Sequence, residues 1–247
     1  MIPIDHPRYT SLIIREEIIN GINAGITSQQ GLIAHGRGEA FDYLIGEKTT
    51  DSARHATKVA VAMMLLAKHP IISVNGNAAA LVPDDLVQLS NILRAPLEVN
   101  LFYKTEERVK KIITHLKDHG ARKIFGLECN ANIPKISHER AKVTREGIYS
   151  ADVILVPLED GDRCEALVNM GKKVIAIDLN PLCRTARTAT ISIIDNIVRV
   201  IPNMILFAKE LILKNESELR ALLDKYDNKK MLQNALDEIY YNITHKL

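Results

Sequence analysis

Apolar residues follow two different periods along the chain, and the period changes near residue 70. Before that point, residues 11–25, 30–45 and 51–68 have the spacing typical of helices. The third of these segments is apolar on most sides, which predicts a buried helix. The first 70 residues are therefore predicted to be helical.

After residue 70, short apolar runs rich in β-branched residues recur, and each predicts a strand. The six runs are residues 71–74, 97–102, 123–127, 153–158, 173–178 and 190–195. Helix-length segments separate them, most clearly 106–119, and such alternation requires crossovers over a mostly parallel sheet. Strands that are apolar on both sides are buried on both faces. We predict an α/β fold with a Rossmann-like, mostly parallel sheet, helices on both faces, a helical N-terminal segment and C-terminal helices.

Neither a repeat nor a Pro/Gly/Ser-rich linker interrupts the 247 residues, which indicates a single domain. Its expected parts are a helical part (1–70), a parallel-sheet core (71–213) and C-terminal helices (214–247). The apolar stripe within 216–247 needs a surface to pack on, either the core or a second subunit.

Composition narrows the classes of partner. A net charge of +2 and 4% aromatic residues give neither the broad positive field nor the stacking surfaces that nucleic acids require. Three widely spaced cysteines are expected to be reduced thiols, and neither a signal peptide nor a membrane-spanning stretch is evident. We expect a cytoplasmic protein that acts on a small anion, without nucleic-acid or membrane partners.

Polar residues follow five of the predicted strands, at the edge where ligands bind in open parallel sheets. They are residues 75–77, 128–130, 159–163, 178–181 and 195–196. Ordinary capping and turn preferences explain any one of these sites equally well. Asp178, which closes a strand, is a candidate acceptor for the hydroxyls of a ribose.

Phosphate-binding residues must be sought outside the usual glycine motifs, because the chain has no Gly-x-Gly-x-x-Gly after a strand and no P-loop. Arg37, between Gly36 and Gly38, is one candidate, with a surface turn as the alternative. Residues 138–145 predict a cationic helix facing the ligand crevice, or else a solvated helix face. Residues 184–188 are a third candidate, as a clamp for nucleotide phosphates or as a plain loop.

Several of these strings resemble the archaeal phosphopantothenate synthetase family. The longest is residues 30–47, QGLIAHGRGEAFDYLIGE, and the others are 73–77, 151–162, 178–182 and 195–197. The similarity extends from about Tyr9 to about Lys209. It implies a homodimeric ligase of coenzyme A biosynthesis that makes 4-phosphopantothenate from 4-phosphopantoate, β-alanine and ATP, releases AMP and diphosphate, and requires Mg²⁺.

The resemblance also implies which residues hold ATP. They are Arg15, Arg37, Asp178, Leu179, Asn180, Arg184, Thr185, Asn196 and Ile197. One departure lies beside them, because Cys183 stands where the family is expected to have serine.

Three further assignments are hypotheses built on that reading. Arg37 and Arg184 are the candidate catalytic residues, since charge builds on phosphate oxygens when a carboxylate attacks the α-phosphorus of ATP. The candidate ligands of phosphopantoate are Asn75, Asn77, His138, Arg140, Lys142 and Arg145, and those of Mg²⁺ are Glu159, Asp160 and Asp162. An NAD(P)-dependent oxidoreductase and a non-catalytic nucleotide-binding module are the alternatives.

Overall fold

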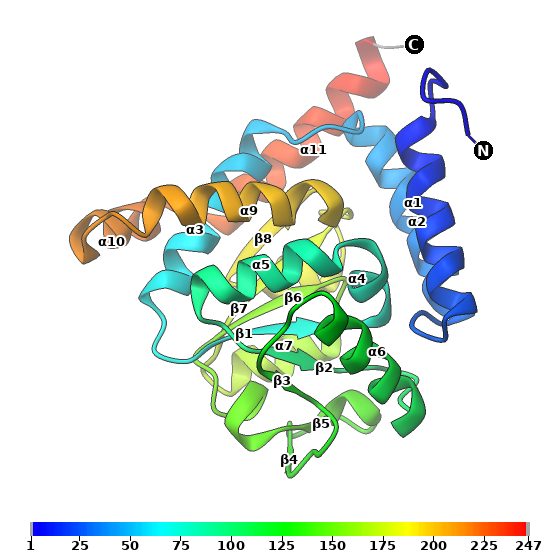
Figure 1. The fold of residues 1–247 in the computed structure, drawn as a ribbon. Helices are drawn as coiled ribbons and strands as arrows, with labels where there is room; N and C mark the ends of the chain where they lie inside the picture. The colour runs from blue at the N-terminus through cyan, green and yellow to red at the C-terminus, as the bar shows by residue number, and fades with distance from the viewer. Residues whose placement is uncertain (1, 246–247) are drawn as a thin grey trace.

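The computed structural model describes residues 2–245 and confirms the helical N-terminal segment (Figure 1). Its helices are α1 (Tyr9–Asn23), α2 (Gln29–Ile45) and α3 (Asp51–Leu66). Side-chain oxygens cap two of them: Ser28 accepts from the backbone N–H of Gly31, and Thr50 accepts from that of Ala53. Helix α3 is buried around most of its circumference, as its sequence predicts.

A six-stranded parallel sheet follows, in the order β3-β2-β1-β6-β7-β8. Its strands are β1 (Pro70–Val74), β2 (Leu97–Val99), β3 (Ile124–Phe125), β6 (Val153–Pro157), β7 (Lys173–Asp178) and β8 (Ile191–Ile194). The chain winds outward from β1 in one direction and from β6 in the other, which is the doubly wound Rossmann order. All six predicted strands are present, but β2 and β3 end earlier than predicted.

Both faces of the sheet are apolar and covered, as the nearly continuous apolar strands predict. Along β6, Leu155 belongs to the core shared with α3, α5 (Pro83–Leu93), α6 (Glu106–Asp118) and α9 (Ile197–Leu211). Its neighbours Ile154 and Val156 belong to the core on the opposite face, shared with α7 (Gly161–Asn169). Figure 1 shows α5 and α9 on one side of the sheet and α7 on the other.

The prediction of a cationic helix over residues 138–145 is wrong. This segment contains a 3-10 turn (Glu139–Ala141) and the strand β5 (Lys142–Val143), which pairs antiparallel with β4 (Ala131–Asn132), and a π-type turn (Arg145–Tyr149) follows it. The reason is a tertiary contact. The buried carboxylate of Glu98 on β2 accepts the backbone N–H groups of Thr144 and Ile148, which fastens the segment to the sheet as a loop.

Two short helices that the sequence did not predict follow strands of the sheet, α4 (Gly76–Leu81) after β1 and α8 (Arg184–Thr188) after β7. The tail forms α10 (Glu216–Asp224) and α11 (Asn228–His245). Leu232 and Ile239 of α11 pack against Ile45, and the Asn242 amide donates to the carbonyl oxygens of Leu44 and Ile45. Part of the apolar stripe of the tail therefore packs on the protein's own core, while Tyr240 and Ile243 of the same stripe stay exposed.

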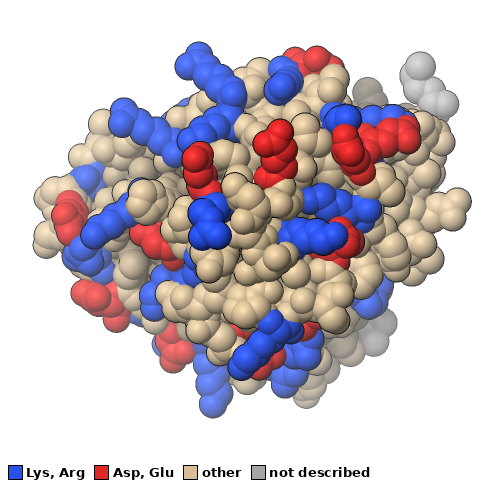
Figure 2. All heavy atoms as spheres, turned by 90° about the horizontal axis from the view of Figure 1, so that it is seen from below, with Lys and Arg blue, Asp and Glu red and all other residues tan. Residues whose placement is uncertain are grey.

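Charges of both signs are interspersed over the face shown in Figure 2, in keeping with the small net charge. Within residues 2–245, every helix is too short or too polar to cross a membrane.

Candidate functional site

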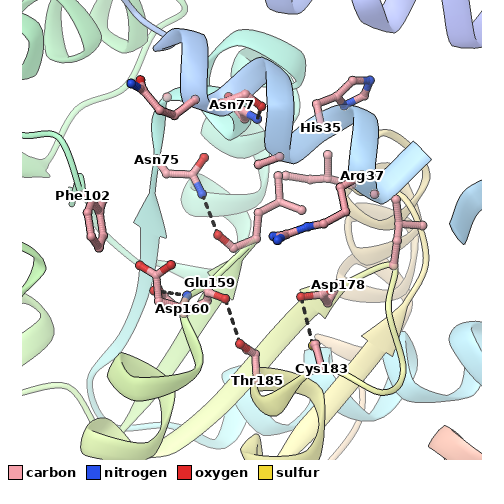
Figure 3. Close-up of a pocket in the computed structure, with 18 of the residues that line it drawn as sticks. His35, Arg37, Asn75, Asn77, Phe102, Glu159, Asp160, Asp178, Cys183 and Thr185 are labelled. Carbon is pink, nitrogen blue, oxygen red and sulfur yellow. Dashed lines mark hydrogen bonds between the residues drawn. The ribbon is translucent and has the colours of Figure 1, made fainter. Parts of the chain in front are cut away.

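A cleft of about 570 Å³ lies where the strands β1, β6, β7 and β8 end, and α2 covers it. Figure 3 shows side chains from α2 and from the ends of β1, β6 and β7 around it. This is the position at which doubly wound sheets bind ligands, because the loops after β1 and β6 diverge there.

Asn75 and Asn77 shape the cleft rather than project freely into it. Asn75 follows β1, and its amide donates to the carbonyl oxygens of Pro157 (2.8 Å) and Leu158 (3.3 Å) at the end of β6. The Asn77 amide donates to the Gly31 carbonyl oxygen at 2.9 Å and so holds α2 over the cleft. Both residues line the cleft, as predicted, with their amide N–H groups already engaged.

Asp178 is the acidic residue at the end of the cleft formed by β7 and β8. One of its oxygens accepts from the Asn180 backbone N–H at 2.9 Å, and the other accepts from the Cys183 thiol at 3.3 Å. Burial raises the pKa of Asp178, although these hydrogen bonds and the nearby charge of Arg37 oppose the rise. A carboxylate held in this way retains lone pairs for the hydroxyl groups of a ligand.

Cys183 performs the local structural role of a capping serine. Its sulfur accepts from the Ala186 backbone N–H at 3.2 Å and caps α8, while the thiol proton points to Asp178. Burial, followed by the charge of Asp178, raises the pKa of this thiol to about 12, so it stays protonated at neutral pH.

Four other predicted nucleotide residues line the same end, and their side chains are either already hydrogen-bonded or apolar. Thr185 donates to the Glu159 carbonyl oxygen at 2.8 Å, and Asn196 donates to Asp42 at 2.7 Å while it caps α9. Ile197 and Leu179 contribute apolar surface, which suits a flat base.

A buried ion cluster of Arg140, Glu159 and Arg163 lies behind the loop after β6. Each oxygen of the Glu159 carboxylate is hydrogen-bonded to one of these arginines, and Arg163 is fully buried. Burial alone raises the pKa of Glu159, but the two guanidinium groups outweigh it and hold that pKa below its usual value. Glu159 is therefore ionised and committed to the arginines.

Three other arginines line the cleft and form no close carboxylate pair within residues 2–245. Arg37 lies inside α2, not in a turn, and its guanidinium points into the cleft (Figure 3). Arg184 is 58% exposed, and its nearest carboxylate oxygen, on Asp162, is 4.0 Å away. Arg108 of α6 was not predicted. We call Arg37, Arg108 and Arg184 the rim arginines.

Five predicted site residues lie outside the lining of the cleft. Arg15 pairs with Glu39 at 2.8 Å, and His138 bonds to Asp162 at 3.0 Å. Lys142 pairs with Glu139 at 2.7 Å, and Arg145 lies over the Tyr149 ring at 5.1 Å. The ATP role that the resemblance gave to Arg15 and the hypotheses made for the other four residues stay predictions.

Sequence reasoning missed Phe102, Tyr103 and Arg108 on the wall of the cleft. The apolar run from residue 97 was extended to 102 as one strand, whereas β2 ends at Val99 and the chain then turns across the cleft. The sequence did contain a signal for Arg108. It is a cation in the first turn of the helix predicted at 106–119, a position that is electrostatically unfavourable for a positive charge.

Fold and site together define a doubly wound α/β protein with a cleft suited to an anionic ligand at its switch point. Comparison with known proteins gives the family. The chain belongs to the phosphopantothenate/pantothenate synthetase family, whose model matches residues 52–242.

Three relatives are each named 4-phosphopantoate–β-alanine ligase. The protein from Methanosarcina mazei is 57% identical, over 96% of this chain and 94% of its own length. The protein from Thermococcus kodakarensis is 54% identical, over 98% of this chain and 94% of its own length. The protein from Methanospirillum hungatei is 49% identical, over 97% of this chain and 96% of its own length.

Proposed function

We propose that this chain is an ATP-dependent ligase that condenses (R)-4-phosphopantoate with β-alanine to 4-phosphopantothenate in coenzyme A biosynthesis. AMP and diphosphate are released, and an acyl-adenylate is the intermediate. The observation that carries the proposal is the near full-length similarity to ligases of that name. The cleft supports it, because rim arginines that have no close carboxylate partner among residues 2–245 suit phosphorylated substrates.

Activation of the acid requires stabilisation of negative charge. The carboxylate oxygen attacks the α-phosphorus of ATP, and the bond to the departing diphosphate breaks, so charge accumulates on phosphate oxygens. Arg37 and Arg184 are positioned to stabilise that charge from opposite sides of the cleft, one on α2 and the other at the start of α8. The β-alanine amine then displaces AMP from the acyl carbon and forms the amide.

ATP is proposed to lie along the ends of β7 and β8. Asp178 accepts hydrogen bonds from the ribose, Leu179 and Ile197 contact the base, and Asn180, Thr185 and Asn196 shape the pocket wall. The acid substrate then lies toward β1 and β2, where Asn75, Asn77 and Arg140 line the cleft.

Mg²⁺ is proposed as the companion of ATP, and Asp160 is the predicted ligand that fits it. Its Oδ2 atom is ion-paired with Arg140 Nε at 3.1 Å, which leaves Oδ1 for the ion, and the residue lines the cleft. Glu159 does not fit, because both of its oxygens are bonded to arginines. Within residues 2–245, no three His, Cys, Asp or Glu side chains gather as a metal site, so substrate phosphates would complete the shell. The ion would neutralise phosphate charge.

A homodimer and a cytoplasmic location complete the proposal. Exposed apolar side chains on the helices around the N-terminal segment and the tail support a self-association surface. They are Ile19, Ile33, Tyr43, Tyr240, Tyr241 and Ile243. Light scattering of the purified protein measures the association, and a monomeric mass at micromolar concentration would refute it.

One assay tests the reaction itself. AMP formation is measured with ATP and Mg²⁺ while 4-phosphopantoate and β-alanine are omitted in turn. Sustained AMP formation that needs both acid and amine is the expected result. ATP binding without such turnover would instead identify a nucleotide-binding module.

A further inference from the structure

Arg108 occupies a position that its own helix disfavours. It is the third residue of α6, where the free N–H groups of the helix end create a partial positive charge and where Glu106 and Glu107 are the favourable residues. A cation there raises the energy of the helix slightly. Its presence calls for an explanation outside the helix.

The guanidinium of Arg108 is held in place by neutral acceptors. Its Nε donates to the Ile26 carbonyl oxygen at 2.8 Å, and Nη1 donates to the Tyr103 carbonyl oxygen at 2.9 Å. Within residues 2–245 no carboxylate pairs with it. Burial, followed by the charge of Arg140, lowers the pKa of Arg108, so two cations repel each other at this end of the cleft.

Gly76 permits this placement. A Cβ atom on Gly76 would lie 2.5 Å from Arg108 Nη2 and 2.5 Å from the Ile26 carbonyl oxygen. The same relation recurs across the cleft, where a Cβ atom on Gly161 would lie 2.5 Å from Arg184 Nε. Absence of a side chain at both positions lets each guanidinium lie directly against the start of a helix.

The position of Arg108 separates it from the proposed nucleotide site. Its helix follows β2, which is three strands from β7 in the sheet, or about 14 Å at the usual strand spacing of ~4.8 Å. The acid substrate carries its carboxylate and its phosphate at opposite ends, and the carboxylate must reach the α-phosphorus of ATP. Its phosphate must therefore point away from Asp178, toward β2.

Apolar surface lines the same cleft. Leu81, Leu101 and Phe102 are part of its lining together with Arg108. This pairing of apolar and cationic surface matches an acid whose dimethyl-substituted carbon adjoins a phosphomonoester.

We infer that Arg108, with Arg140 beside it, binds the phosphate of the acid substrate and selects the phosphorylated acid over the free hydroxy acid. The inference rests on the proposed function. Arg140 is already neutralised by Glu159 and Asp160, so Arg108 supplies the uncompensated charge.

Steady-state kinetics of Arg108→Ala test the assignment. The KM for 4-phosphopantoate should rise ~10- to 100-fold, as expected for loss of charge-assisted hydrogen bonds. The kcat/KM for unphosphorylated pantoate and the KM for ATP should not change, so selectivity between the two acids falls by the same factor. Inorganic phosphate, competitive with 4-phosphopantoate in the wild type, should inhibit the variant less by a similar factor.

Two further variants serve as controls. Arg122→Ala removes an exposed arginine that follows α6 and does not line the cleft, and it should keep wild-type selectivity. Arg108→Lys retains the positive charge but not the planar guanidinium group with its paired N–H donors. Its KM for 4-phosphopantoate should lie between those of the wild type and Arg108→Ala. If the alanine variant does not fold, the lysine variant is compared with the wild type in its place.

Two outcomes would overturn the assignment: unchanged acid selectivity in an active Arg108 variant, or a rise in the ATP KM in place of the acid KM. Absence of acid- and amine-dependent AMP formation by the wild type would instead refute the proposed function.

Discussion

The buried ion cluster and the rim arginines use the same side chain for opposite purposes. In the cluster, Arg140 and Arg163 share the carboxylate of Glu159, and the side chains are at most 9% exposed. Around the cleft, Arg37, Arg108 and Arg184 have no close carboxylate partner within residues 2–245. An arginine whose charge is already neutralised supports the architecture, whereas one without a partner retains its charge for a ligand.

This difference predicts opposite consequences for substitutions in the two regions. Removal of charge from the cluster should reduce stability, because the remaining buried ions lose their partner. Removal of a rim arginine should reduce binding or catalysis more than stability, because no internal carboxylate is left unpaired.

The largest expected effect is that of Glu159→Gln. It leaves the buried guanidinium of Arg163 without a carboxylate and that of Arg140 with Asp160 alone, so the free energy of unfolding should fall by about 3–5 kcal/mol. Urea denaturation at pH 7 measures the change. A loss below about 0.5 kcal/mol would show that the cluster contributes no more than a surface pair.

The pH dependence of the same variant sharpens the test. Because the pKa of Glu159 is lowered in the folded protein, its stabilisation is complete above the unfolded value near 4.3 and is lost as pH falls through the folded value. The difference in stability between the wild type and Glu159→Gln should therefore shrink on acidification below about pH 4.3. A difference that grows on acidification would contradict the assigned charge states.

Arg37→Ala is expected to reduce kcat by ~10²-fold or more, the usual cost of removing a group that stabilises transition-state charge. Its thermal unfolding should match that of the wild type, because the side chain is exposed. Stopped-flow or coupled measurement of AMP release gives kcat, and calorimetry gives the unfolding temperature. Wild-type kcat in a folded variant would refute a catalytic role.

The smallest effect is expected at Cys183, which belongs to neither region. Cys183→Ala removes the cap of α8 and the donor to Asp178, so stability should fall by about 1 kcal/mol and the ATP KM should rise. Cys183→Ser keeps a donor and an acceptor and should behave like the wild type in both measurements. Equal behaviour of the alanine and serine variants would show that neither hydrogen bond matters.

Sequence patterns predicted the structure correctly wherever residues close together in the chain determine it. Residues 153–158 and 173–178 are apolar on both sides, so their strands, their burial and the sheet they form follow from the sequence alone. Asp178 was predicted to be a ligand residue for the same reason, since it closes such a strand. The strings of residues 30–47 and 178–182 were long enough to indicate the family, which the comparisons confirm.

Only the tertiary structure decided which charges are paired. Glu98 fixes residues 144–148 as a loop from about 50 positions away, and Glu159 takes Arg140 from 19 positions away. Arg108 and Gly76 meet because β1 and β2 are neighbours in the sheet. The sequence shows that a cation is present, but electrostatic energy depends on distance and burial in space. Whether an arginine supports the fold or is free to bind phosphate is therefore determined only when the chain has folded.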